Sequence, residues 1–344
     1  MNLKELSKQL GLSQTTVSRA LGGYPEVSAK TRARVAQAAK EFDYQPNKKA
    51  RGLATGRSFN IGHVLTTHNR YELVNPIFGD FIGGLTETSA AAGYSLSLSL
   101  TEQDEEEATY RKLKSEGSID GIVLQSPRPN DPRIALMRDI GLPFVVHGRA
   151  TNVSDPYAWV DVNNRRAFER ATQFLLDLGH RRIGLLNGDE RLDFAMRRRA
   201  GYEATLHSAD ITPDLDLMWR GPMTEDHGHA VAKDYLARHE RPTALLVSSI
   251  ILAIGARRAI QEAGLEIGRD VSLISYDDDL SYLSNRQSVP VFTAVRSSVL
   301  SAGREIAKML IGQIEDPTAS NIPNLLLEAE LVVGMSTGPV PDAL

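Results

Sequence analysis

The 344-residue chain contains no cysteine. A disulfide-stapled scaffold, a zinc site built on thiolates and a cysteine nucleophile are therefore excluded. Nothing in the composition points to an oxidising compartment, where disulfides are common. We expect a cytoplasmic protein, and the 42% hydrophobic content is enough to form a buried core.

Long hydrophobic runs are also missing. The most apolar stretch, residues 244–256, is interrupted by Ser248 and Ser249 and is too short to cross a bilayer. Residues 1–6 are not the start of a secretory signal, because no apolar segment follows them. Neither secretion nor membrane insertion is expected.

Enzyme motifs are absent as well. The chain has no dinucleotide-binding glycine fingerprint, no phosphate-binding loop, no His-Glu-x-x-His and no Gly-x-Ser-x-Gly. His227 and His229 are two positions apart, which turns them to different sides of a helix and disfavours a shared metal. The acidic run 102–107 suits a solvated helix start better than a catalytic pair. No catalytic residue, metal ligand or cofactor is predicted.

Charge is distributed unevenly along the chain. Residues 1–60 contain 11 Lys and Arg against 4 Asp and Glu, whereas the rest contains 28 against 39. A basic segment joined to an acidic remainder is typical of a small polyanion-binding module attached to a larger domain. Because a domain takes roughly 100–200 residues, the chain should form two or three compact units.

The basic segment has the pattern of three short helices. We expect these helices over residues 3–10, 14–21 and 29–42. Gly11 ends the first helix, and Ser13 and Ser28 are placed to cap the second and the third. The first two helices meet at a tight turn, which predicts a helix-turn-helix with a supporting third helix. A generic three-helix bundle is the alternative.

The outward face of the second helix carries short polar side chains and one guanidinium, namely Gln14, Thr15, Ser18 and Arg19. Such groups suit base edges and phosphates. The segments 11–19 (GLSQTTVSR), 27–32 (VSAKTR) and 44–47 (YQPN) resemble the head of the lactose/galactose-repressor (LacI/GalR) family of bacterial transcription regulators.

The resemblance implies that Gln14, Thr15 and Arg19 read the major groove, while Ser28, Thr31 and Asn47 hold phosphates. The complete set of expected DNA-binding residues is Ser13, Gln14, Thr15, Thr16, Arg19, Ser28, Thr31, Asn47, Arg51, Leu53 and Ala54.

Residues 47–57 form a basic hinge that is too short to be a stable helix alone. Gly52 weakens it further, so we expect it to fold only on DNA. The resemblance implies that Leu53 then wedges between central base pairs and bends the site; a plain linker is the alternative. The expected domains are therefore a head over 1–46, the hinge over 47–57 and an effector-binding core over 58–344.

In the core, short β-rich runs alternate with helical stretches in two series, over residues 61–146 and 165–276. This alternation predicts an α/β fold with two doubly wound parallel-sheet subdomains. Ligands of such folds bind beyond the carboxyl ends of the strands, so we expect a pocket in the cleft between the subdomains.

The core segments 178–184 (LGHRRIG), 198–202 (RRAGY), 255–260 (GARRAI) and 271–278 (VSLISYDD) also match the family, whose core resembles periplasmic sugar-binding proteins. The resemblance places Arg198 and Asp277 on ligand hydroxyls. An ordinary salt bridge between subdomains is the alternative.

Three segments depart from the common family pattern, namely 147–149 (HGR), 163–164 (NN) and 248–250 (SSI). The first is similar to the subset that responds to α-linked glucosides or disaccharides. Phe78, Trp159, Trp219 and Phe292 are candidates for stacking on a sugar, with core packing as the alternative for each. The expected effector-binding residues are Phe78, His147, Arg149, Asn163, Arg198, Ser249, Asp277 and Phe292.

We therefore expect a homodimeric repressor that binds near-palindromic operator DNA and responds to a small molecule. A carbohydrate is favoured as effector. The alternatives are a regulator that responds to a purine or another small molecule, and a regulator whose ligand acts as a corepressor. Two other classes of protein are disfavoured. An enzyme that carries a DNA-binding head would need catalytic groups, and the sequence shows none. A sensor that binds no operator would not need the DNA-reading pattern of residues 14–19. No leucine-heptad helix follows Gly334, which argues against a coiled-coil tetramer.

Overall fold

The computed structural model describes residues 1–22, 24–44, 52, 55–67, 73–276, 280–283, 285, 289–318 and 321–341. It divides into two compact units, Met1–Phe59 with Gly117–Ile119 and Asn60–Glu116 with Asp120–Leu344. We call these the N-terminal unit and the core unit, and each is described by itself.

The N-terminal unit contains three helices: α1 (Leu3–Leu10), α2 (Gln14–Leu21) and α3 (Ala29–Glu41). Asn2 caps α1 through a reciprocal pair of hydrogen bonds with Glu5. Gly11 ends α1 at a φ of 64°, a left-handed conformation that glycine adopts without strain. Leu6, Val17 and Val35, one from each helix, are fully buried and form the centre of a small apolar core.

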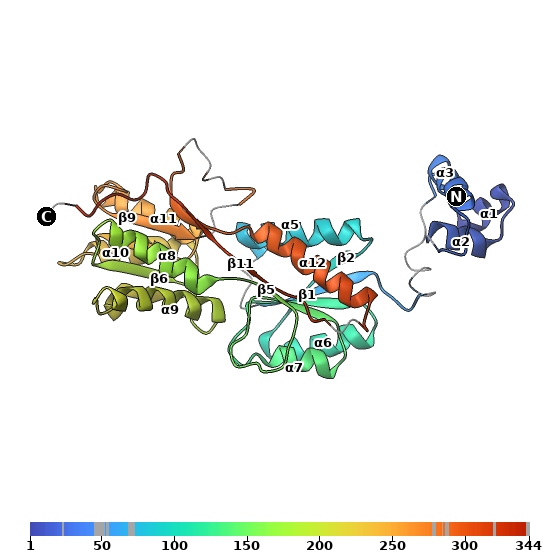
Figure 1. Ribbon diagram of the computed structural model, residues 1–344, viewed down its shortest axis with the longest axis horizontal. Coiled ribbons are helices and arrows are strands. Elements are labelled where there is room, and N and C mark those ends of the chain that lie inside the picture. The colour runs from blue at the N-terminus through green and yellow to red at the C-terminus, as the bar shows by residue number, and fades with distance from the viewer. Residues whose placement is uncertain are drawn as a thin grey trace. The chain divides into compact units, whose positions relative to one another are not determined.

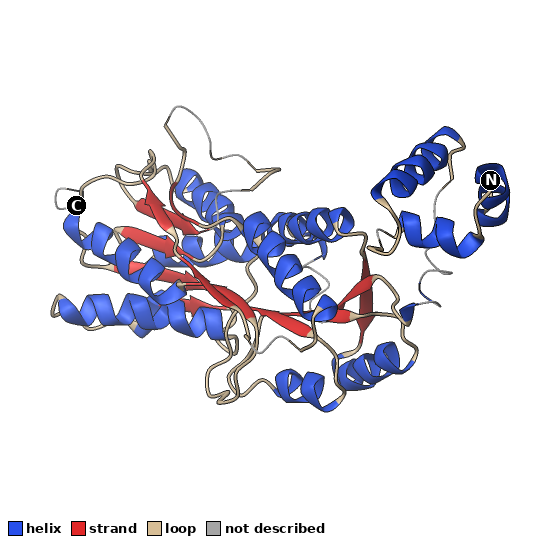
Figure 2. Ribbon diagram, turned by 45° about the vertical axis from the view of Figure 1, so that its right-hand side comes forward, coloured by secondary structure: helices blue, strands red, loops and turns tan. Residues whose placement is uncertain are grey.

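Helices flank the sheets of the core unit (Figure 2). The first subdomain of the core unit is built on a six-stranded sheet with the order β11-β5-β4-β3-β1-β2. Its strands, which all pair in parallel, are β1 (Asn60–Thr66), β2 (Ser95–Thr101), β3 (Gly121–Gln125), β4 (Phe144–His147), β5 (Trp159–Val162) and β11 (Asn324–Leu327). The helices that connect them are α5 (Pro76–Ala91), α6 (Glu106–Ser115) and α7 (Pro132–Asp139), with a 3-10 turn η2 (Gln103–Glu105).

The second subdomain has the sheet order β12-β10-β9-β8-β6-β7. Its strands are β6 (Ile183–Asn187), β7 (Met218–Arg220), β8 (Ala244–Val247), β9 (Ser272–Tyr276), β10 (Thr293–Arg296) and β12 (Glu330–Val332), of which β12 pairs antiparallel with β10. Its helices are α8 (Asn164–Asp177), α9 (Asp193–Ser208), α10 (Glu225–Leu236) and α11 (Ile250–Glu262), and η3 (Leu215–Leu217) precedes β7.

The chain crosses between the subdomains more than once. After β10 it returns to the first subdomain as α12 (Val299–Glu315), which lies against α5 (Figure 1). The two helices approach closely because each has a glycine at the contact. A Cβ on Gly84 would lie 2.0 Å from the Leu300 carbonyl oxygen of α12, and one on Gly303 would lie 2.3 Å from the Phe81 carbonyl oxygen of α5. The crossings hold the two sheets in one unit, with the carboxyl ends of their strands at the cleft between them.

Candidate nucleic-acid interface and ligand cleft

The outer face of α2 presents the side chains that the sequence predicted to read bases. Gln14, Thr15 and Arg19 are exposed, whereas Val17 and Ala20 on the opposite face are buried. Arg19 makes a single long ion pair with Glu26 at 3.6 Å, and both side chains are half exposed. A pair of this kind holds the guanidinium weakly, so Arg19 is accessible to a ligand.

Two of the predicted phosphate contacts, Ser28 and Thr31, lie at the start of α3, and the predicted DNA contacts Ser13 and Thr16 lie at the start of α2. Ser13 caps α2 by accepting from the Thr16 backbone N–H at 3.0 Å, and its hydroxyl lies 2.8 Å from that of Thr16. Ser28 and Thr31 repeat the arrangement at the start of α3, at 3.2 and 2.9 Å. The four hydroxyls therefore stabilise the two helix N-termini, whose free backbone N–H groups attract anions.

Two other arginines of the N-terminal unit have structural roles that the sequence did not indicate. Arg32 donates to the carbonyls of Tyr24 and Val27, at 3.1 and 2.9 Å. Arg34 donates to the Leu10 carbonyl at 2.8 Å. These bonds fix the turn before α3 and the end of α1, so both cations contribute to the fold of the unit.

The predicted hinge contacts Asn47, Arg51, Leu53 and Ala54 lie outside the described residues. Within the hinge, the Gly56 N–H donates to the Gly52 carbonyl at 2.8 Å. A hydrogen bond between residues four positions apart is that of one α-helical turn.

A cavity of about 200 Å³ opens at the carboxyl ends of β1 and β3, where the strand order reverses. The first subdomain lines it with residues that include His63, Gln125 and Arg133. The second subdomain adds the loop after β6, with Asp189 and Arg191. The place where the strand order reverses, the switch point, is where doubly wound sheets bind ligands. The cavity therefore lies where the sequence predicted a pocket.

One wall of this cavity is a network around Arg133. Its guanidinium pairs with Asp131 at 2.7 Å and with Glu106 at 3.5 Å, and Glu106 also accepts from the Tyr110 hydroxyl at 2.8 Å. Burial alone would raise the pKa of Asp131, but hydrogen bonds from Arg133 bring it below its usual value. The Asp131 carboxylate is thus held ionised beside Arg133.

Beneath the cavity, two histidines lie among phenylalanine rings. The His147 ring stacks on Phe81 at 4.6 Å, and the His63 ring is 5.8 Å from Phe78. Burial lowers the pKa of both His63 and His147 to about 4, so both are neutral at pH 7. Of the two, only His63 lines the cavity.

Arg198, on α9 of the second subdomain, is 5% exposed. It donates to the Asn164 side chain at 2.8 Å and to the Ser248 carbonyl at 2.7 Å, and it lies over the Tyr276 ring at 3.7 Å. Among the described residues it forms no salt bridge. Asp277, the other predicted contact to ligand hydroxyls, is outside the described residues, so the salt-bridge alternative stays open.

The other predicted effector residues have local structural partners. Asn163 and Ser249 cap α8 and α11. The Phe292 backbone exchanges two hydrogen bonds with the Asn285 side chain, and Phe78 is buried in α5. None of these four residues lines either cavity described here.

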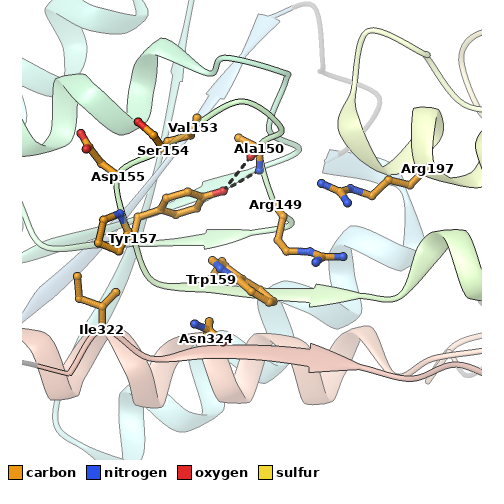
Figure 3. Close-up of a pocket in the computed structure, with 11 residues that line it drawn as sticks. Arg149, Ala150, Val153, Ser154, Asp155, Tyr157, Trp159, Arg197, Ile322 and Asn324 are labelled. Atoms are coloured by element: carbon orange, nitrogen blue, oxygen red, sulfur yellow. Dashed lines mark hydrogen bonds between the residues drawn. The ribbon is translucent and has the colours of Figure 1, made fainter.

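Arg149 and Trp159 line a second cavity of about 240 Å³ (Figure 3). Arg149 lies 5.0 Å from the centre of the Trp159 ring and pairs with Asp161 at 2.7 Å. Arg197 points toward the same space from α9. Burial raises the pKa of Asp161 even though Arg149 donates to it.

The two subdomains are joined between the cavities by Asp193, which is 2% exposed. Its carboxylate accepts from the backbone N–H of Thr151 at 2.8 Å and from the Thr151 hydroxyl. Its own backbone N–H donates to the Pro127 carbonyl at 3.0 Å. Asp193 thus binds two loops of the first subdomain from the first turn of α9.

Among the described residues, no helix is long and apolar enough to cross a membrane. In the same part of the chain, no three His, Asp or Glu side chains are grouped so that they could hold a metal ion. His227 bonds to Thr224, and His229 pairs with Glu262 at 2.7 Å.

Comparison with known proteins identifies the family. Residues 2–47 match the bacterial regulatory proteins of the lacI family, and residues 172–337 match a periplasmic binding protein-like domain. The HTH-type transcriptional regulator AglR of Rhizobium meliloti (strain 1021) is 45% identical over 99% of this chain and 96% of its own length. The chain belongs to the LacI family of bacterial regulatory proteins.

Two solved structures support the same assignment. The transcriptional regulator CelR in complex with cellobiose is 27% identical, with a TM-score of 0.72 over 98% of this chain and 99% of that one. The Lac repressor dimer bound to operator and an anti-inducer is 25% identical, with a TM-score of 0.78 over the same shares. These relatives are transcription regulators.

Membership of the LacI family confirms the predicted fold class, a helical head followed by two parallel-sheet subdomains. This LacI-family protein is therefore a DNA-binding transcription regulator. The site residues named from the sequence stay predictions.

Proposed function

We propose that this LacI-family regulator represses genes of carbohydrate use, and that a saccharide bound in the 200 Å³ cleft cavity changes its affinity for operator DNA. The observation that carries the proposal is the cavity itself, which both subdomains line with charged and polar groups at the switch point. A sugar suits such a lining, because each hydroxyl can donate and accept one hydrogen bond. The similarity to a regulator solved with cellobiose supports this ligand class.

On the DNA side, we assign base reading to Gln14, Thr15 and Arg19, which α2 presents together on its exposed face. Phosphate binding falls to the α2 and α3 starts, with Ser13, Thr16, Ser28 and Thr31. The hinge residues Asn47, Arg51, Leu53 and Ala54 complete the proposed contacts. A homodimer presents two such heads to a near-palindromic site, and a bacterial regulator meets its operator in the cytoplasm.

On the ligand side, we assign the principal contacts to Arg133, Asp189 and Arg191, because they line the cavity from both subdomains. Arg198 and Asp277 are kept as proposed contacts from deeper in the cleft. Arg149 borders the other cavity, and the remaining candidates, Phe78, His147, Asn163, Ser249 and Phe292, act through packing and helix capping. The ligand is bound and released unchanged.

Calorimetric titration of the full chain tests the ligand class. The panel contains maltose, trehalose, sucrose and cellobiose, with adenine, guanine and hypoxanthine as the alternative class. We expect at least one saccharide to bind at a single site per chain and to be recovered unchanged. Binding of a purine with no saccharide binding would overturn the proposal, and hydrolysis of the saccharide would show an enzyme.

Arg191→Ala locates the binding site. Arg191 is 86% exposed and pairs with Asp189 at 2.6 Å, so its loss leaves the fold intact. Removing a charged hydrogen-bond donor should weaken saccharide binding by about tenfold. Arg238→Ala is the matched control, because Arg238 pairs with Asp234 at 2.8 Å on α10 and lines neither described cavity. Equal dissociation constants for the parent and both variants would place the ligand elsewhere.

A further inference from the structure

His63 is an unusual residue for the centre of a buried strand. It occupies the fourth position of β1, whose other central residues, Ile61, Val64 and Leu65, are apolar and buried. The His63 side chain is 1% exposed, and the strand lies between β2 and β3. Nothing in the packing of a parallel sheet requires a polar ring at this position.

The hydrogen-bond partner of His63 fixes which nitrogen carries the proton. Nδ1 lies 3.0 Å from the carbonyl oxygen of Val123. A carbonyl can only accept, so Nδ1 bears the hydrogen and Nε2 presents a lone pair. Nε2 is buried and has no hydrogen-bond partner.

A second acceptor without a partner lies beside the first. The Gln125 amide neighbours the His63 ring, and its Oε1 is also buried and without a hydrogen-bond partner. His63 and Gln125 both line the cleft cavity. A buried acceptor without a donor costs free energy, and a ligand hydroxyl in the cavity that both side chains line can supply that donor.

We infer that His63 is a specificity-determining residue of the cleft, and that it accepts a hydrogen bond from one hydroxyl of a polyhydroxylated ligand through Nε2. This inference rests on the proposed binding of a saccharide in the cleft. The arginines that line the same cavity, Arg128, Arg133 and Arg191, supply donors to the hydroxyl oxygens. A hydroxyl can donate to His63 while it accepts from a guanidinium, whereas an ether or a deoxy position cannot donate.

The test pairs a change in the protein with a change in the ligand. The probes are the saccharide of the panel that binds the parent chain most tightly and its monodeoxy derivatives, one for each hydroxyl. The protein variants are His63→Phe, which keeps a ring but has no acceptor, and Thr172→Val. Thr172 is the control because its buried hydroxyl also lacks a partner and it lines neither described cavity.

We expect one monodeoxy derivative to bind the parent and Thr172→Val at least tenfold more weakly than the complete saccharide. In His63→Phe the same derivative and the complete saccharide should bind within twofold of each other, because the partner of the missing hydroxyl is already gone. If each derivative loses the same factor in binding affinity, relative to the complete saccharide, in the parent and in His63→Phe, the inference is overturned and the proposed function stands. If no saccharide binds the parent, the proposed function fails, and the inference fails with it.

A measurement on the parent chain covers the case in which His63→Phe does not fold. In a sample labelled with nitrogen-15 at histidine, the complete saccharide should shift the Nε2 resonance of one buried neutral histidine, since that nitrogen becomes a hydrogen-bond acceptor. The critical monodeoxy derivative at saturation should leave the resonance in place. An Nε2 resonance that stays unchanged with the complete saccharide would overturn the inference.

Discussion

The first subdomain contains two neutral histidines, the buried His63 and the half-buried His147, with Phe78 and Phe81 packed against them. Burial disfavours the imidazolium form of both, and the nearby His63 further lowers the pKa of His147. Both bind a proton more readily in the unfolded chain than in the folded one. The stability of the core unit should therefore depend on pH.

The sign follows from the two states of each ring. The pKa of His147 is about 4 in the folded chain and about 6.5 when unfolded, so the free energy of unfolding falls as pH decreases from 6.5 toward 4. His147→Phe keeps the stack on Phe81 and removes one titrating group. Urea unfolding at several pH values gives the slope of the unfolding free energy against pH, which reports how many protons the chain takes up on unfolding. Between pH 4 and 6.5 this uptake should be smaller by nearly one proton in the variant. An identical slope would mean that His147 is already charged in the folded chain.

The sequence identified some residue roles and missed others for a physical reason. The caps at Ser13 and Ser28 depend on residues a few positions away, so a local pattern reveals them. The Arg133 network and the Asn164 bond to Arg198 join residues distant in sequence, and only the fold brings them together. His63 had a signal, a histidine inside an apolar run, but its environment depends on β3.

At the level of elements, α2 is the helix that we propose reads DNA. It is only eight residues long, so its stability comes from the Ser13 cap and from packing of Val17 and Ala20. That anchoring fixes which side chains point outward. Gln14, in the first turn, is placed where recognition helices contact base edges.

Gln14→Ala should therefore weaken binding to a duplex that the parent selects from random-sequence DNA by about tenfold or more, since a bidentate base contact is worth about 1–3 kcal/mol. Binding to unselected DNA should change less than twofold, because phosphate contacts persist. Gln37→Ala is the control, as Gln37 is equally exposed on α3 and bonds to Glu41. Fluorescence anisotropy gives the constants. Equal losses on both DNAs would show that α2 does not read bases.

Long alternating elements such as β1, α5 and β3 were predicted because apolar periodicity marks them. The short strands β5, β7, β10, β11 and β12 were not, since three or four residues carry little pattern and three of these strands, β7, β11 and β12, lie at sheet edges. Helix α12 was also missed, although Ile306, Leu310 and Ile314 have helical spacing.

On the scale of the whole molecule, the subdomains of the core meet at Asp193, which holds Thr151 beside both cavities. A ligand that binds residues of both subdomains stabilises one arrangement of this junction over others. The chain enters the first subdomain directly after the hinge, at β1. A change in the cleft can therefore reach the DNA-binding segment through the strand that carries His63.

The most direct test is the operator affinity of the full chain with and without a saturating saccharide, measured by fluorescence anisotropy at one salt concentration. Coupling between two sites is typically about 1–3 kcal/mol, so the dissociation constant should change at least fivefold. An increase identifies an inducer and a decrease a corepressor. An unchanged dissociation constant at saturation, with saccharide binding verified by calorimetry in the same sample, would contradict the account.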